Sequence, residues 1–179
     1  MSLPRPFAGR RRAPLEPDIA EAIGSEGPDR ALAWAEDGPG APMVAGRHRL
    51  HLVRRVPSGG VEQVLDRPWH LVDSGTWSSA DTSLTVTWVD RHQPTRLVLP
   101  DPGLLPETLR ERVQASVVLA ETLDLGGRRS ARVVVRRVLA TDELVSQAVL
   151  GPGVRIDDPG VREEVLAGLA RVREQVGLT

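Results

Sequence analysis

Short runs of alternating apolar and polar residues, separated by glycine- and proline-rich turns, constrain this chain more than any other feature. In residues 83–90, Leu84, Val86 and Trp88 share one face of an extended segment, and threonines occupy the other face. The clusters that separate such runs are Asp-Gly-Pro-Gly at 37–40, Pro-Ser-Gly-Gly at 57–60 and Gly-Gly at 126–127. This pattern predicts an antiparallel sheet whose strands are joined by short turns.

The same reasoning assigns a strand to each of the other alternating runs. These are residues 31–36, 43–56, 61–77 and 95–100, followed by 130–139 and 143–151. Residues 116–125 either continue a preceding helix or form a strand. The alternation of Val117, Leu119, Leu123 and Leu125 before the Gly-Gly turn favours a hairpin with 130–139.

Three segments repeat apolar residues at the helical spacing instead. The first contains Leu15, Ile19 and Ile23, the second covers 104–115 with Leu105, Leu109 and Val113 in one stripe, and the third covers 159–176. Asp158 is expected to cap the third helix and Pro159 to occupy its first turn. Gly177 is expected in the left-handed conformation that ends a helix, with Leu178 folding back onto Val172.

The composition excludes several classes of function. Because the chain has no cysteine, it has no disulfide, thiolate nucleophile, zinc ribbon or iron–sulfur cluster. No apolar run reaches the roughly 18 residues of a membrane span, and the N-terminus lacks the apolar region of a signal peptide. A cytoplasmic protein is therefore expected. All 23 basic residues are arginines, but Lys, Asn and Tyr are absent together, which indicates a GC-rich genome rather than selection for phosphate binding.

No catalytic, cofactor-binding or metal-binding residue is assigned from the sequence. His70, Asp73 and Ser74 resemble a catalytic triad, but His70 and Asp73 would point to opposite faces of a strand, and no Gly-x-Ser-x-Gly motif is present. His48 and His51 fall on opposite faces of a predicted strand in the same way, without a helical His-Glu-x-x-His motif. We therefore expect a structural role for these residues and no enzymatic activity.

The four tryptophans, Trp34, Trp69, Trp77 and Trp88, have two interpretations. They could stack on bases or sugars, as in single-strand binding proteins, or they could fill the core of the sheet. The chain has no tyrosine and one phenylalanine, so tryptophan is the only large aromatic residue available in number for packing. Packing is the favoured interpretation.

Arginines supply most of the candidate contacts to a partner. Residues 1–14, which include Arg10, Arg11 and Arg12, carry no acidic residue and are expected to form a flexible basic tail. In the predicted hairpin, Arg132 and Arg136 share one face, which could be a basic strip for a phosphate-bearing partner. The commoner arrangement is pairing with acidic residues across strands. The acidic residues nearby in sequence are Glu121, Asp124, Asp142 and Glu143.

Several segments of the chain resemble bacterial pleckstrin-homology-like (PH-like) domains. The matching segments are Gly46-Arg47-His48-Arg49-Leu50, Trp69-His70-Leu71-Val72 and Leu84-Thr85-Val86. The stretch from about Asp29 to Leu150 also looks like uncharacterised actinobacterial proteins. The resemblance implies a β-rich module without catalytic activity that ends in one long helix, where this sequence instead predicts a hairpin after residue 116. Arg54 and Arg55 alone could replace the lysines with which eukaryotic relatives of the fold bind phosphoinositides.

The sequence thus predicts an α+β protein, with a mainly antiparallel bent sheet or partial barrel of PH-like type and a C-terminal covering helix. Residues 15–179 are expected to form one domain, with a PH-like part over 29–115 and an extension over 116–179. The predicted function is a non-catalytic interaction or scaffolding module that binds a protein partner, a second copy of itself included. The alternatives are a nucleic-acid-associated protein that uses the N-terminal arginines and the hairpin, and an enzyme of unknown class. The candidate partner contacts are Arg10, Arg11, Arg12, Arg54, Arg55, His70, Arg132 and Arg136, and no cofactor is expected.

Overall fold

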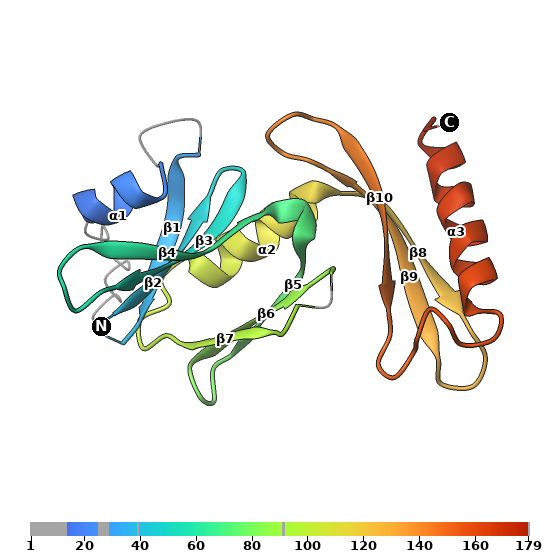
Figure 1. Cartoon of the computed structure of the whole chain (residues 1–179), viewed down its shortest axis with the longest axis horizontal. Helices are drawn as coiled ribbons and strands as arrows, with labels where there is room; N and C mark the ends of the chain where they lie inside the picture. Colours follow the sequence, from blue (N-terminus) through green and yellow to red (C-terminus); the bar gives the residue numbers. More distant parts are fainter. Residues whose placement is uncertain (1–13, 25–28, 39, 91, 179) are drawn as a thin grey trace, which may run out of the picture.

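The helices and strands follow one another in short connections along the chain (Figure 1). The computed structural model describes residues 14–24, 29–38, 40–90 and 92–178. The first part contains helix α1 (Pro17–Ala22) and strands β1 (Ala31–Asp37), β2 (Ala41–Gly46), β3 (Arg49–Arg55) and β4 (Val61–Pro68). A 3-10 turn, η1 (Trp69–Leu71), leads to β5 (Val72–Ser78), β6 (Ser83–Trp88), β7 (Thr95–Val98) and helix α2 (Leu105–Ser116). The last part contains β8 (Val117–Asp124), β9 (Ser130–Arg137), β10 (Leu144–Leu150) and helix α3 (Val161–Gln175).

The strands form three antiparallel sheets rather than one. Their orders are β1-β2-β3-β4, β5-β6-β7 and β10-β9-β8, so within each sheet the paired strands are neighbours in sequence. The sheets are open and do not close into a barrel. The predicted α+β class, with bent antiparallel sheets and a C-terminal covering helix, is therefore confirmed.

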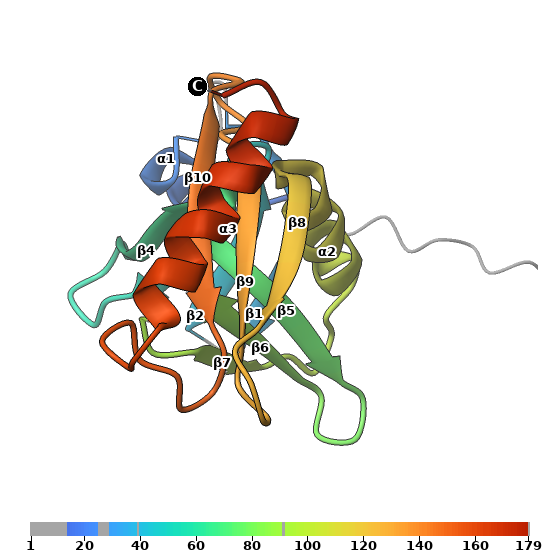
Figure 2. The ribbon, with the colours of Figure 1, turned by 90° about the vertical axis from the view of Figure 1, so that its right-hand side faces the viewer.

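Two separate cores hold these layers together. The larger core lies between the β1–β4 and β5–β7 sheets and includes Leu105 and Leu109 of α2, which packs between the two sheets (Figure 1). The second core lies between β8–β10 and α3, which runs across one face of that sheet (Figure 2). A small third cluster joins α1 to the outer face of the first sheet through Ile19, Ile23 and Val53. Burial of these apolar side chains is the main stabilising contribution.

The tryptophans serve packing, as the composition indicates. Trp69 and Trp88 are buried in the larger core, and Trp77 packs against it. Trp34 packs against the cluster beneath α1. The packing interpretation is confirmed for all four residues.

The prediction of one strand over residues 43–56 is wrong, because the chain reverses at residues 47–48. There β2 and β3 form a tight hairpin in which Val44 pairs with His51 and Ala45 with Leu50. The Arg47 N–H donates to the Arg30 carbonyl at 3.0 Å, and this bond helps to hold the turn. Residues 46–49 lack the usual proline or Asn-Gly signal of a turn, so the alternation appeared continuous.

The predicted strand over residues 61–77 is likewise interrupted. β4 ends at Pro68, and the Val72 N–H donates to the Trp69 carbonyl to close η1 before β5 begins. This turn carries the chain from the first sheet to the second. His70 therefore lies in a turn, where the alternation of faces along a strand does not apply.

The hairpin over residues 116–139 is confirmed, since β8 pairs with β9 along its length. The C-terminal helix is also confirmed, but its N-cap is Gly160, not Asp158. The Asp158 carboxylate accepts instead from the Arg155 N–H at 3.0 Å, within the preceding turn. At the other end, the Gly177 and Leu178 N–H groups donate to the Glu174 and Arg173 carbonyls, as expected for a left-handed glycine closure.

Gly75 sets how closely β5 approaches α2. A Cβ atom at Gly75 would overlap Leu109 Cδ2, and Leu109 is buried and cannot withdraw freely. We expect Gly75→Ala to lower the free energy of unfolding by about 1–3 kcal/mol through overpacking. The measurement is urea denaturation followed by tryptophan fluorescence.

Gly40→Ala is the matched control, because a Cβ there meets nothing within 4 Å and its φ is not positive. Its expected change is below about 0.5 kcal/mol. Combining Gly75→Ala with Leu109→Ala should cost less than the sum of the two single changes. Equal midpoints for the Gly75→Ala chain and the native chain would contradict the close approach.

Candidate functional site

The face of the third sheet that α3 leaves uncovered turns toward the first part of the protein. Along β9, Ala131, Val133 and Val135 enter the core beneath α3. The alternate residues Arg132, Val134 and Arg136 therefore lie on the other face, where they line a cavity against α2 and β5. We call this site the junction cavity, because it lies where α2 leads into β8 (Figure 1).

Arg136 is the most unusual residue of the junction cavity, because its charged side chain is almost completely buried. The side chain is 2% exposed. Its Nη1 donates to Ser116 Oγ at 2.9 Å, and Ser116 Oγ in turn donates to the Val113 carbonyl at 2.7 Å. Nη2 lies 3.7 Å from Asp73 Oδ1, and Nε is buried without a hydrogen-bond partner. Buried polar atoms without partners are rare in folded proteins.

Asp73 of β5 is shared between two guanidinium groups. It accepts from Arg132 Nη2, and it also lies in ion-pair range of Arg136. Burial lowers the pKa of Arg136, the carboxylate of Asp73 opposes this effect, and Arg132 adds to the lowering. Arginine still keeps its proton at neutral pH. Two cations facing one carboxylate leave the cavity wall with an excess of one positive charge.

The charged groups near the junction cavity also affect the pKa of His70 in η1. Burial lowers the pKa of His70, and the positive charges of Arg136 and Arg49 lower it further. The imidazole is therefore neutral at pH 7, and its Nδ1 is buried without a hydrogen-bond partner. His70 thus adds no charge that would compensate the arginines.

The junction cavity has a volume of about 330 Å³. Its walls come from α2, β5, β8 and β9 and consist of Asp73, Val113, Gln114, Val117, Ala120, Arg132, Val134 and Arg136. Half of these side chains are apolar, and the polar groups are the shared carboxylate, one amide and the two guanidiniums. Ligand sites in proteins combine these features, at volumes of about 300–1,000 Å³.

The structure brings three of the predicted contact residues together and separates the others. Arg132 and Arg136 line the junction cavity, and His70 lies near enough to Arg136 for its charge to lower the pKa of the imidazole. Arg54 is exposed on β3 and does not line this cavity. Its neighbour Arg55 forms ion pairs with Glu16 at 2.8 Å, Glu36 at 3.6 Å and Asp18 at 3.8 Å. Arg10, Arg11 and Arg12 lie outside the described residues.

The prediction that Arg132 and Arg136 share a face is right, but an exposed position is wrong for Arg136, and the predicted acidic partners are wrong for both. Arg136 is buried, so it does not form part of a solvent-exposed basic strip. The acid that faces both arginines is Asp73, which is 59 residues away from Arg132 in sequence. Of the acids in the hairpin region, Glu121 pairs with Arg171 and Asp142 pairs with Arg137.

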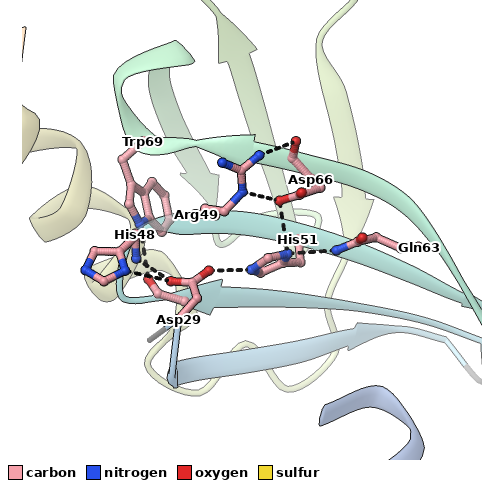
Figure 3. A network of polar contacts seen from close by, with 8 residues as sticks. Asp29, His48, Arg49, His51, Gln63, Asp66 and Trp69 are labelled. Atoms are coloured by element: carbon pink, nitrogen blue, oxygen red, sulfur yellow. Dashed lines mark hydrogen bonds and ion pairs between the residues drawn. The ribbon is translucent and has the colours of Figure 1, made fainter. Parts of the chain in front are cut away.

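A second polar cluster surrounds Asp29, at the entrance to β1 (Figure 3). Its carboxylate accepts from His51 Nε2 at 2.7 Å and from the His48 N–H at 2.5 Å. On the other side of the His51 ring, Gln63 Nε2 donates to Nδ1 at 3.0 Å. Arg49 donates to Asp66 on the outer side of the same sheet. This chain of bonds links the residue before β1, the β2–β3 turn, β3 and β4.

The prediction that His48 and His51 lie on opposite faces of one strand is wrong, because His48 lies in the turn between β2 and β3. Both residues therefore reach the carboxylate of Asp29. Gly46 makes room for this carboxylate, since a Cβ at Gly46 would lie 2.6 Å from Asp29 Oδ2. The role of Asp29 could not be predicted, because nothing in the sequence relates it to a histidine 22 residues later.

The residues that resemble a triad do not assemble into one. Ser74 Oγ bonds to Thr87 Oγ1 at 2.8 Å, and Asp73 bonds to Arg132 rather than to a histidine. Within the described residues, no group of three metal-ligating side chains comes together. Among the described residues, no helix is long and apolar enough to span a membrane.

None of the protein-family models, curated proteins and solved structures compared with this chain matches it. The chemistry of the two polar clusters is therefore interpreted from their own residues. The Asp29 cluster satisfies its buried groups internally, and the junction cavity does not.

Proposed function

We propose that this chain is a non-catalytic interaction module of PH-like type, acting in the cytoplasm, and that it binds a protein partner at the junction cavity. The observation that carries the proposal is the buried guanidinium of Arg136, whose Nε has no partner at the edge of an apolar cavity. The order of four strands, three strands and a helix over residues 31–116 also supports the PH-like type. The β8–β10 sheet and α3 are an addition to that arrangement.

The energetics of Arg136 favour a binding role over a purely structural one. Burial of a charge is costly unless ion pairs and hydrogen bonds compensate it. Asp73 compensates only in part, because its shorter contact goes to Arg132. A core that served stability alone would replace Arg136 with an apolar residue of similar volume at little or no cost. The retained charge is therefore explained best by a ligand that supplies the missing acceptor.

The arginines of β9 offer little surface to nucleic acid. Arg136 is buried, and Arg132 and Arg137 each hold a carboxylate within the protein. Neutralising several backbone phosphates requires free cationic side chains. We therefore do not advance the nucleic-acid function.

The test is a synthetic library of random octapeptides, half with free carboxyl termini and half amidated. The full chain is screened against this library in parallel with its Arg132→Ala and Arg137→Ala variants. We expect a related set of peptides to bind the native chain and the Arg137→Ala chain, and to lose about tenfold or more in affinity for Arg132→Ala. Both arginines are partly exposed and adjacent to β10, but only Arg132 lines the cavity. If no peptide binds, or if Arg132→Ala binds like the native chain, the proposal is wrong.

A further inference from the structure

One edge of the Arg136 guanidinium has no hydrogen-bond acceptor within the described part of the protein. Nη1 is occupied by Ser116 Oγ at 2.9 Å. On the opposite edge, Nε has no partner, and Nη2 lies 3.7 Å from Asp73, beyond hydrogen-bond distance. The Nε and Nη2 hydrogens point side by side in the plane of the group and match the two oxygens of a carboxylate.

The net charge of the cavity favours a ligand that carries one negative charge. Arg132 and Arg136 together carry two positive charges against the single negative charge of Asp73, and His70 is neutral. One added carboxylate would therefore make the cluster neutral. It would also satisfy the Nε–H of Arg136 without displacing Asp73 from Arg132.

The remaining wall of the cavity is apolar and close to this charge. Val113 of α2 and Val134 of β9 line the same volume of about 330 Å³ as Arg136. A ligand must then present its carboxylate and a small apolar group only a few atoms apart. The last residue of a peptide does so when its side chain is valine or leucine, because both groups branch from one Cα.

On one side of the cavity, the rest of a bound peptide can extend toward solvent. Ala120 and Gln114, which line it, are exposed. We infer that the junction cavity binds the C-terminal carboxylate of a partner protein whose last residue carries a branched apolar side chain. This inference rests on the proposed function and specifies the chemistry that the site recognises.

Three small probes distinguish the contributions of the carboxylate and of the peptide amide to binding. N-acetyl-leucine carries the carboxylate, the side chain and the peptide amide, whereas N-acetyl-leucinamide lacks only the carboxylate. The third probe, 4-methylpentanoate, keeps the carboxylate and the branched chain but has no amide. Each is titrated into the isotope-labelled full chain to about 10 mM, because ligands of this size bind weakly. The readouts are the backbone amide resonances and the Nε–H resonance of Arg136.

We expect N-acetyl-leucine to shift the Arg136 Nε–H resonance and the amide resonances of residues 113–120. N-acetyl-leucinamide should bind at least about ten times more weakly, since it loses a charge-assisted hydrogen bond pair. Equal binding of the acid and the amide, or no shift with any probe, would overturn the inference. Tighter binding of 4-methylpentanoate than of N-acetyl-leucine would assign the site to free acids and would also overturn it.

A pair of variants tests where the ligand binds without removing the buried charge of Arg136. Ala120→Phe places a ring in the mouth of the cavity, on an exposed position of β8 that tolerates a larger side chain. Ala115→Phe makes the same change on an exposed residue of α2 outside the cavity. We expect Ala120→Phe to weaken N-acetyl-leucine binding about tenfold or more and Ala115→Phe to leave it unchanged. Equal effects of the two changes would contradict the assigned site.

The two proposals can fail separately. If library peptides bind through the cavity regardless of amidation, the protein-partner function stands and the carboxylate site is wrong. If N-acetyl-leucine binds at Arg136 but no library peptide does, the carboxylate chemistry stands and the protein-partner function is wrong.

Discussion

Trp69→Ala is expected to lower the free energy of unfolding by about 4 kcal/mol, the largest loss for any single change proposed for this protein. Trp69 has no solvent-exposed surface and packs in the core that joins both N-terminal sheets. Its Nε1–H donates to the Gly46 carbonyl at 3.1 Å, so the change also leaves that carbonyl without this donor. The cavity that remains is enclosed by strands and α2, which limits how far the site can collapse.

Urea denaturation followed by far-UV circular dichroism measures this loss without relying on tryptophan fluorescence. Trp77→Ala is the matched control, because Trp77 is only partly buried at the margin of the same core. Its loss should be less than half as large. Similar losses for the two variants would show that Trp69 has no special place in the core.

Asp29→Ala is expected to cost about 3 kcal/mol, the second largest effect. The change removes the acceptor of the buried Nε2 of His51 and of the partly buried His48 N–H. Asp29→Asn should cost only about 1 kcal/mol. The asparagine oxygen can still accept from His48, and its amide can donate to the other tautomer of His51. The measurement is the urea midpoint at pH 7.

Asp157→Ala is the control for this series. Asp157 forms an exposed ion pair with Arg162, which should contribute less than about 1 kcal/mol. A loss for Asp29→Ala no larger than that for Asp157→Ala would show that the buried network contributes no stability of its own.

The contribution of Asp29 should also depend on pH. Burial by itself raises the pKa of Asp29, but hydrogen bonds from His51 and His48 outweigh burial and hold the pKa below its ordinary value of 3.8. A carboxyl group with a lowered folded-state pKa adds stability above its unfolded pKa and loses this contribution as the pH falls through the folded value. The difference in unfolding free energy between native and Asp29→Asn should therefore narrow below pH 3.8. A constant difference down to pH 2.5, which is about one unit lower, would contradict a lowered pKa.

The candidate site was predictable in part. Alternation along residues 130–139 placed Arg132 and Arg136 on one face, and this follows from the two-residue period of any strand. Which layer would cover that face was not predictable, because Asp73 and Ser116 approach from other elements. Two residues of opposite charge within apolar strands, Asp73 and Arg136, were the one available signal. A single sequence does not show that they meet.

The two interrupted strands have one physical origin. The turn at residues 47–48 and the turn η1 lie within runs that alternate like continuous strands, and contacts distant in sequence hold both of them. Asp29 and Arg30 bind the first turn, and Trp69 in the second turn donates to the carbonyl of Gly46. Local propensity cannot encode a partner that lies 19 or 23 residues away.

The sequence by itself determined most local features of this protein: its helices, most of its strands, its turn glycines, the left-handed end of α3 and the packing role of its tryptophans. These depend on backbone geometry and on the removal of apolar side chains from water, which act over a few residues. Only the tertiary structure decided that there are three sheets, that Arg136 is buried beside a shared carboxylate, and that His48 and His51 meet Asp29. Burial and charge compensation depend on which layers face each other, and that is a property of the whole fold.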